Sequence, residues 1–143
     1  MKSLTINEIQ IGTEATFVKT ITEKDVEAFA SITEDKNPAH MDEVYASKSI
    51  FKRRIAHGML VGSLFSTIFG VMLPGLGSIY TKQSLKFTKP VFFGDTITAK
   101  VSVKEKNMER NRVTFDCVAF NQNDEVVVVG EAEIMPPIQE VKL

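Results

Sequence analysis

The sequence has only one cysteine and no excess of positive charge. With Cys117 alone, an intramolecular disulfide and a four-cysteine zinc or iron–sulfur site are excluded. A reducing, cytoplasmic compartment is therefore the expectation. Lys and Arg together number 17 against 18 for Asp and Glu, which leaves no basic surplus to neutralise a phosphate backbone. We therefore do not expect a nucleic acid partner.

Long hydrophobic runs are also missing. Residues 1–15 alternate polar and apolar side chains and lack the continuous apolar core of a signal peptide. The most apolar stretch, residues 59–73, is interrupted by glycine, serine and threonine and is shorter than the roughly 18 residues that a membrane span requires. The sequence therefore predicts neither export nor membrane insertion, and we expect residues 59–73 to form a buried helix.

The length and composition are those of one globular domain. The chain has 143 residues, of which 43% are hydrophobic and 24% charged. No repeat, low-complexity tract or linker interrupts it. A single domain over residues 1–143 is therefore predicted.

The hydrophobic pattern indicates both strands and helices. Alternation over residues 14–21 predicts a first strand, and Thr22 with Asp25 has the spacing of a capping box before a helix over 23–32. The second half of the chain alternates with period two, in four segments whose last two breaks are short enough for hairpins: 78–87, 95–106, 112–120 and 125–135. The prediction is an α+β domain in which a largely antiparallel sheet wraps around the central helix.

Asp35 and His40 are the candidates for acid and base chemistry. On a continuous helix, side chains five residues apart would point about 140° away from each other. Pro38 breaks the helix between them within an expected loop over 33–40, so both could turn into one pocket and activate a water. The alternative is a solvated loop carboxylate and an exposed histidine.

His57 and Gly58 stand where the apolar helix should begin. The first turn of a helix leaves backbone N–H groups without partners, and a glycine lets a ligand carbonyl come close to its N–H. An oxyanion could bind there, as acyl chemistry requires. The alternative is a packing or capping glycine beside a boundary histidine whose hydrogen bonds are satisfied within the protein.

The central helix 59–73 carries no ionisable side chain, so a general acid and base must come from elsewhere, which points to Asp35 and His40. Ser66 could assist by hydrogen bonding, although a buried helical serine more often bonds the carbonyl four residues earlier. Cys117 alternates with apolar residues and is predicted to be a packed core thiol.

Other motifs are weak or missing. No glycine-rich phosphate loop, nucleophilic-serine motif or metal-ligand spacing is present, so we expect neither a metal nor a cofactor. The basic run Lys52–Arg54 could contact phosphates, but a solvated surface is the commoner role of such a run.

Three further motifs stand out: Asp35-x-Asn37-Pro38-x-His40, Ile55-Ala56-His57-Gly58-Met59-Leu60 and Pro90-Val91-Phe92-Phe93-Gly94-Asp95. Together they resemble the MaoC-like, (R)-specific enoyl-CoA hydratases of the hot-dog fold, in particular the short bacterial hydratases that supply polyhydroxyalkanoate synthesis. The resemblance spans nearly the whole chain. Two residues depart from the family motif: Glu34 stands where glycine is frequent, and Ala39 where a larger aliphatic residue is common.

The resemblance implies a homodimer that hydrates trans-2-enoyl-CoA reversibly to (3R)-3-hydroxyacyl-CoA. Asp35 and His40 would be the catalytic pair and would hold one water between them. The Gly58 N–H would bind the thioester oxygen, and Ser66 and Asn37 would support the pair. Coenzyme A would be the carrier of the substrate.

Phe69 is a candidate for the end of the acyl pocket. If the thioester lies at the start of the central helix, the acyl tail runs beside that helix and meets Phe69 further along it. A preference for acyl chains of about four to six carbons would follow. The alternative is that Phe69 points into the core.

Three rival functions use the same fold. A hot-dog thioesterase commonly has a catalytic acid on the central helix, and a dehydratase acting on acyl carrier protein usually has a glutamate there. Neither acid is present in residues 59–73. The third rival is an acyl-CoA-binding protein without catalysis.

Overall fold

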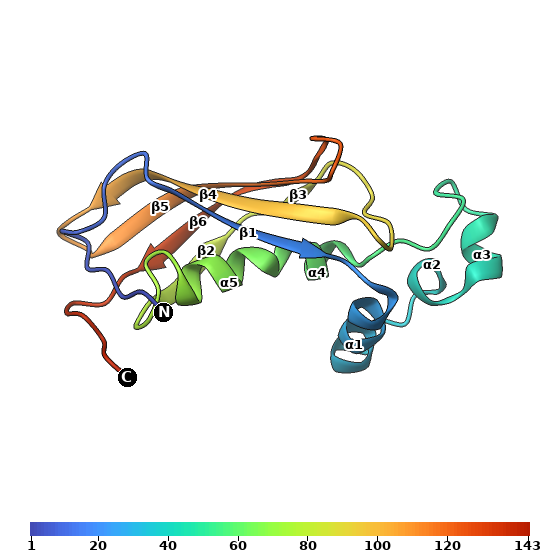
Figure 1. Ribbon diagram of the computed structural model, residues 1–143, viewed down its shortest axis with the longest axis horizontal. Coiled ribbons are helices and arrows are strands. Elements are labelled where there is room, and N and C mark those ends of the chain that lie inside the picture. The colour runs from blue at the N-terminus through green and yellow to red at the C-terminus, as the bar shows by residue number, and fades with distance from the viewer.

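One antiparallel sheet of six strands forms a layer over the most apolar helix of the chain (Figure 1). The computed structural model describes residues 1–143. The strand order is β1-β4-β5-β6-β2, and the short β3 also pairs with β6. All pairings are antiparallel, as predicted. The strands are β1 (Glu14–Thr20), β2 (Ile79–Gln83), β3 (Lys86–Phe87), β4 (Thr96–Asn107), β5 (Arg112–Phe120) and β6 (Val126–Met135).

The predicted central helix is present but divided. It consists of α4 (Gly58–Gly62) and α5 (Leu64–Val71), which meet at Ser63. The Ser63 hydroxyl donates to the Leu60 carbonyl at 2.6 Å, and a local bond of this kind competes with the regular helical ladder. The single helix expected over 59–73 is therefore corrected to two short, consecutive helices.

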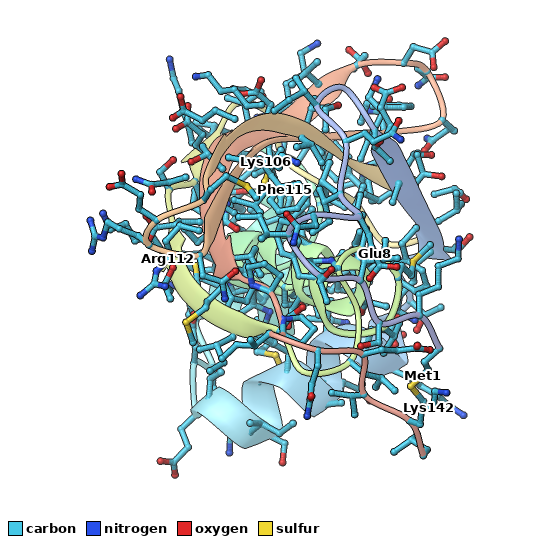
Figure 2. The ribbon with its side chains drawn as sticks, turned by 90° about the vertical axis from the view of Figure 1, so that its left-hand side faces the viewer. Met1, Glu8, Lys106, Arg112, Phe115 and Lys142 are labelled. Atoms are coloured by element: carbon cyan, nitrogen blue, oxygen red, sulfur yellow. The ribbon has the colours of Figure 1, made fainter.

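The core lies between α5 and the inner face of the sheet. Residues of β4 and β5 alternate between buried and partly exposed positions, as a half-buried sheet requires. Figure 2 shows the sheet curving over the helix, with Phe115 between the two layers. Cys117 is only 3% exposed, so its predicted role as a core thiol is confirmed.

The segment expected as one strand over 78–87 forms two. β2 and β3 both pair with β6, and between them the Ser84 carbonyl lies against Gly130. A Cβ on Gly130 would stand 1.9 Å from that carbonyl oxygen. The strand pair is therefore kept in this arrangement by the absence of a side chain at Gly130.

Three further helices gather near one end of the sheet, beyond the start of α4 (Figure 1). They are α1 (Glu23–Thr33), α2 (Pro38–Met41) and α3 (Glu43–Ser47). The predicted capping box is formed at α1, since the Asp25 N–H donates to the Thr22 hydroxyl and the Thr22 N–H donates to the Asp25 carboxylate. None of the helices has the length and apolarity needed to cross a bilayer.

Candidate active site

The loop between α1 and α2 positions Asp35 directly after the end of α1. Glu34 ends the helix in the left-handed region with φ of 64°, and its N–H donates to the Ala30 carbonyl. Only glycine adopts this region without steric cost. This explains why the family that the sequence resembles often has glycine at the position of Glu34. The chain reverses at Glu34 and brings Asp35 back toward α4.

Asn37 connects Asp35 to the helix that carries His40. Its backbone N–H donates to the Asp35 carboxylate at 3.2 Å, and its side-chain oxygen accepts from the Ala39 N–H at 2.9 Å. Pro38 occupies the first position of α2, as its fixed φ and missing N–H favour. This geometry supports the proposed role of Asn37 in orienting the pair.

His40 is half-buried, and one backbone contact fixes its tautomer. Its Nδ1 lies 2.7 Å from the Ile55 carbonyl oxygen. A carbonyl only accepts, so Nδ1 must carry the hydrogen, and Nε2 of the neutral ring keeps a free lone pair. Burial lowers the pKa of His40 below its ordinary value of 6.5, and the nearby His57 lowers it further, although the hydrogen bond to Ile55 and the Asp35 charge act to raise it. The neutral ring, with Nε2 as a base, is therefore favoured.

His57 lies against His40. The two rings stack with centroids 3.9 Å apart and planes inclined by 29°. A carboxylate oxygen of Asp35 and one nitrogen of each ring lie within 4.8 Å of one another. A metal ion would need in-plane lone pairs that converge at about 2.1 Å. Two stacked rings direct these lone pairs side by side, so the three groups are arranged poorly for a metal.

These side chains stand at a mainly apolar cavity of about 710 Å³. Its size is ample for a small organic ligand, and its few polar groups lie together among hydrophobic walls. A ligand with an apolar chain and a polarised head group fits such a lining. The apolar walls come from α1, α4, β3, β6 and the loops between them: Phe29, Phe51, Ile55, Met59, Val61, Phe87, Val91, Val127 and Val128.

Gly58 is the first residue of α4 and lines the cavity. A Cβ at this position would stand 2.9 Å from two ring carbons of Phe87, closer than real Cβ contacts. The N–H of a first helical residue has no partner within its helix. Packing against Phe87 therefore leaves no room for a side chain at Gly58, as the packing alternative expects. The binding of a thioester oxygen by the Gly58 N–H remains a prediction.

The other two predicted site residues lie outside this cavity. Ser66 is exposed on α5, about two turns beyond Gly58. Phe69 is 2% exposed, and its ring contacts Phe115 at 4.8 Å and Tyr80 at 5.2 Å between centroids. α5 carries both residues away from the cavity, with Phe69 packed under the sheet and Ser66 exposed. Their roles in the reaction therefore remain predictions.

Several lining residues escaped the sequence analysis. Phe87 lies over Gly58, and Phe29 packs against His57 with ring centroids 4.9 Å apart. The sequence analysis placed Phe87 in the expected strand 78–87 and Phe29 in the expected helix 23–32, and assigned neither residue to the site. A hydrophobic pattern shows which residues are apolar, but it does not show which of them meet around a cavity.

A curved antiparallel sheet packed on a central helix defines the hot-dog class of α+β proteins. Within that class, the model of the MaoC-like domain matches residues 7–122. The chain belongs to the MaoC-like family. The predicted α+β hot-dog fold is confirmed.

Relatives of similar length agree with this assignment. The chain is 46% identical over 132 residues to an (R)-specific enoyl-CoA hydratase of Rhodospirillum rubrum, covering 91% of this chain and 90% of the relative. An unliganded R-hydratase of Pseudomonas aeruginosa has 43% identity and a TM-score of 0.92, over 99% of this chain and 92% of that one. An (R)-hydratase of Aeromonas caviae, described as involved in PHA biosynthesis, has 42% identity and a TM-score of 0.88, over 90% and 98%.

Proposed function

We propose that the protein is an (R)-specific enoyl-CoA hydratase, which adds water reversibly to trans-2-enoyl-CoA and gives (3R)-3-hydroxyacyl-CoA. The observation that carries the proposal is the pairing of the Asp35 carboxylate with a His40 ring whose Nε2 is free, at an apolar cavity. Family membership and the activity of the similar hydratases support the same reaction.

A single water serves as nucleophile and proton source in the proposed mechanism. It donates one hydrogen bond to the Asp35 carboxylate and one to His40 Nε2, which leaves an oxygen lone pair for C3 of the substrate. As the C3–O bond forms, one water proton passes to the pair. The pair returns a proton to C2 on the same face, so the addition is syn and the overall reaction consumes one water.

The Gly58 N–H would stabilise the negative charge that develops on the thioester oxygen. This polarisation makes C3 electrophilic and stabilises the enolate-like transition state more than the ground state. A positioned acid/base group contributes about 100- to 10,000-fold to the rate, and one oxyanion donor about 3 to 4 kcal/mol. The proposed chemistry is an addition of water and involves no redox change.

The proposed partners are an acyl-CoA thioester and a second copy of the chain. We propose a homodimer as the active species, on the basis of the resemblance to dimeric hot-dog hydratases. The (R) product would be a monomer for polyhydroxyalkanoate synthesis, as the Aeromonas relative suggests. Sedimentation at decreasing protein concentration, with parallel activity assays, tests whether a monomer is equally active; an equally active monomer would contradict the dimer proposal.

Loss of the conjugated-enoyl absorbance of crotonyl-CoA on addition of purified protein tests the activity. Chiral analysis should identify the product as the (3R) enantiomer. Release of free thiol would indicate a thioesterase instead, and binding without turnover would indicate an acyl-CoA-binding protein. Turnover of an acyl-carrier-protein substrate in strong preference to the CoA thioester would indicate the dehydratase rival.

A further inference from the structure

His57 is the most deeply buried polar residue at the site, with 2% of its surface exposed. Its Nε2 lies 2.9 Å from the backbone carbonyl oxygen of Asp35. Because that oxygen only accepts, Nε2 must carry the hydrogen and donate it. His57 therefore holds the backbone of one member of the catalytic pair.

The same ring supports the other member of the pair. The His57 ring stacks on the His40 ring with centroids 3.9 Å apart. Phe29 also packs against the His57 ring, with centroids 4.9 Å apart. His40 is thus confined between the stacked ring and the Ile55 carbonyl that accepts from its Nδ1. Its ring has little freedom to turn or tilt.

His57 also begins the helix that provides the proposed oxyanion donor. It is the N-cap of α4, and its carbonyl accepts from the N–H groups of Leu60 and Val61 at 3.1 and 3.3 Å. The peptide bond between His57 and Gly58 carries the N–H assigned to the thioester oxygen. One residue therefore contacts or adjoins all three parts of the site.

Packing alone does not account for a histidine here. His57 Nδ1 is buried and has no hydrogen-bond partner, and an unpaired buried polar atom is unfavourable for stability. A phenylalanine would fill the space between Phe29 and His40 without that cost. What the histidine adds is the single N–H that points at the Asp35 carbonyl.

We propose that His57 is a positioning residue for the hydratase reaction. Its N–H sets where Asp35 stands, and its ring sets where His40 stands, so the carboxylate and Nε2 of His40 are kept at a separation that one water bridges. The inference rests on the proposed function, because the separation matters only if a water is activated there. It acts on geometry, so it predicts a loss in turnover rather than in substrate binding.

Three substitutions separate the two contacts. H57F keeps an aromatic ring against His40 and removes the N–H, H57Q keeps an N–H that reaches the Asp35 carbonyl and removes the ring, and H57L removes both. We expect kcat to fall about 10- to 100-fold in H57F, as misplacement by about 1 Å does in other enzymes, with KM for crotonyl-CoA changed less than threefold. H57Q should retain more turnover than H57L.

A second variant, V113A, tests whether a general loss of stability alone could lower kcat in H57F. Val113 is fully buried on β5 and does not line the cavity, so V113A weakens the core without touching the site. At a temperature well below both melting points, V113A should keep wild-type kcat while H57F does not. If both variants lose activity in proportion to their loss of stability, the positioning role is overturned.

Amide hydrogen exchange over residues 33–37 gives a readout that does not depend on catalysis. Exchange there should speed up in H57F and H57L, but much less in H57Q, because only the first two lose the N–H to Asp35. Wild-type kcat and unchanged exchange in H57F would overturn the inference. An inactive wild-type protein whose loop exchange still responds to H57F would instead overturn the hydratase proposal and leave the contact with Asp35 established.

Discussion

The Asn37 backbone N–H donates to the Asp35 carboxylate at 3.2 Å, while the Asn37 side chain caps α2, the helix that carries His40. One residue thus joins the loop of Asp35 to the helix of His40. On a continuous helix, the side chains of Asp35 and His40 would point away from each other. The turn at Asn37 and Pro38 breaks the helix and brings the two side chains to the same site. The local sequence therefore brings Asp35 and His40 to one site, and the contacts with Ile55 and His57 set how the two side chains lie.

Asn37→Ala should weaken this connection. Loss of an N-cap side chain costs about 0.5 to 2 kcal/mol of stability, and α2 should then hold His40 less well. We expect a modest fall in melting temperature together with a fall in kcat. Asn37→Asp keeps the capping oxygen and is the matched control for stability. Unchanged kcat in Asn37→Ala would show that the cap does not orient the pair.

The rate should depend on pH through His40. Burial lowers the pKa of His40, so the neutral ring persists to a pH below the ordinary value of 6.5. Because only the neutral ring can accept a hydrogen bond from the water through Nε2, kcat/KM should stay level through neutral pH and fall as the pH drops through this lowered pKa. The pH profile of kcat/KM measures it. A fall centred at or above pH 6.5 would contradict the assignment of His40 as the buried base.

Gly58→Ala should reduce activity through a steric clash. The added Cβ would meet Phe87 at 2.9 Å, and the resulting shift would misplace the N–H by enough to cost about tenfold or more in kcat/KM. Phe87→Leu in the same protein should restore part of the loss. Gly70→Ala is the matched control, since a Cβ on Gly70 meets nothing within 4 Å. Equal activity of Gly58→Ala and Gly70→Ala would contradict the role of Gly58.

Phe69→Ala separates a core role from a pocket role. Its ring packs between Phe115 and Tyr80, so truncation should lower the free energy of unfolding by about 3 to 5 kcal/mol. The packing predicts an unchanged ratio of kcat/KM for four-, six- and eight-carbon substrates. A shift of that ratio toward eight carbons would show that Phe69 limits the acyl chain, as the order of residues along the helix suggests.

Local signals explain why much of the fold could be predicted. The Thr22 and Asp25 capping box, the helix break before Pro38 and the strands expected over 14–21, 95–106, 112–120 and 125–135 each depend on a few neighbouring residues and are present. The loop expected over 33–40 is shorter, because α1 extends to Thr33 and α2 begins at Pro38. Asp35 and His40 were found in the same way, because one short motif contains both. The predicted Gly58 position at the start of a helix is also observed.

Features that depend on contacts between distant segments could not be predicted from the sequence. The break at Ser63 and the splitting of the strand at Ser84 arise from a side-chain hydrogen bond and from close approach to Gly130. The position of Phe69 depends on which face of α5 meets the sheet. The contact of His57 with Asp35 joins residues 22 apart, and nothing in either segment alone predicts it.

Turnover of crotonyl-CoA by Asp35→Asn and His40→Gln tests the central claim most directly. Each change removes acid/base function while nearly preserving volume, so kcat should fall at least about a hundredfold while circular dichroism and the melting curve stay close to wild type. Near-wild-type turnover in either variant, with the fold intact, would contradict the assignment of these two residues as the catalytic pair.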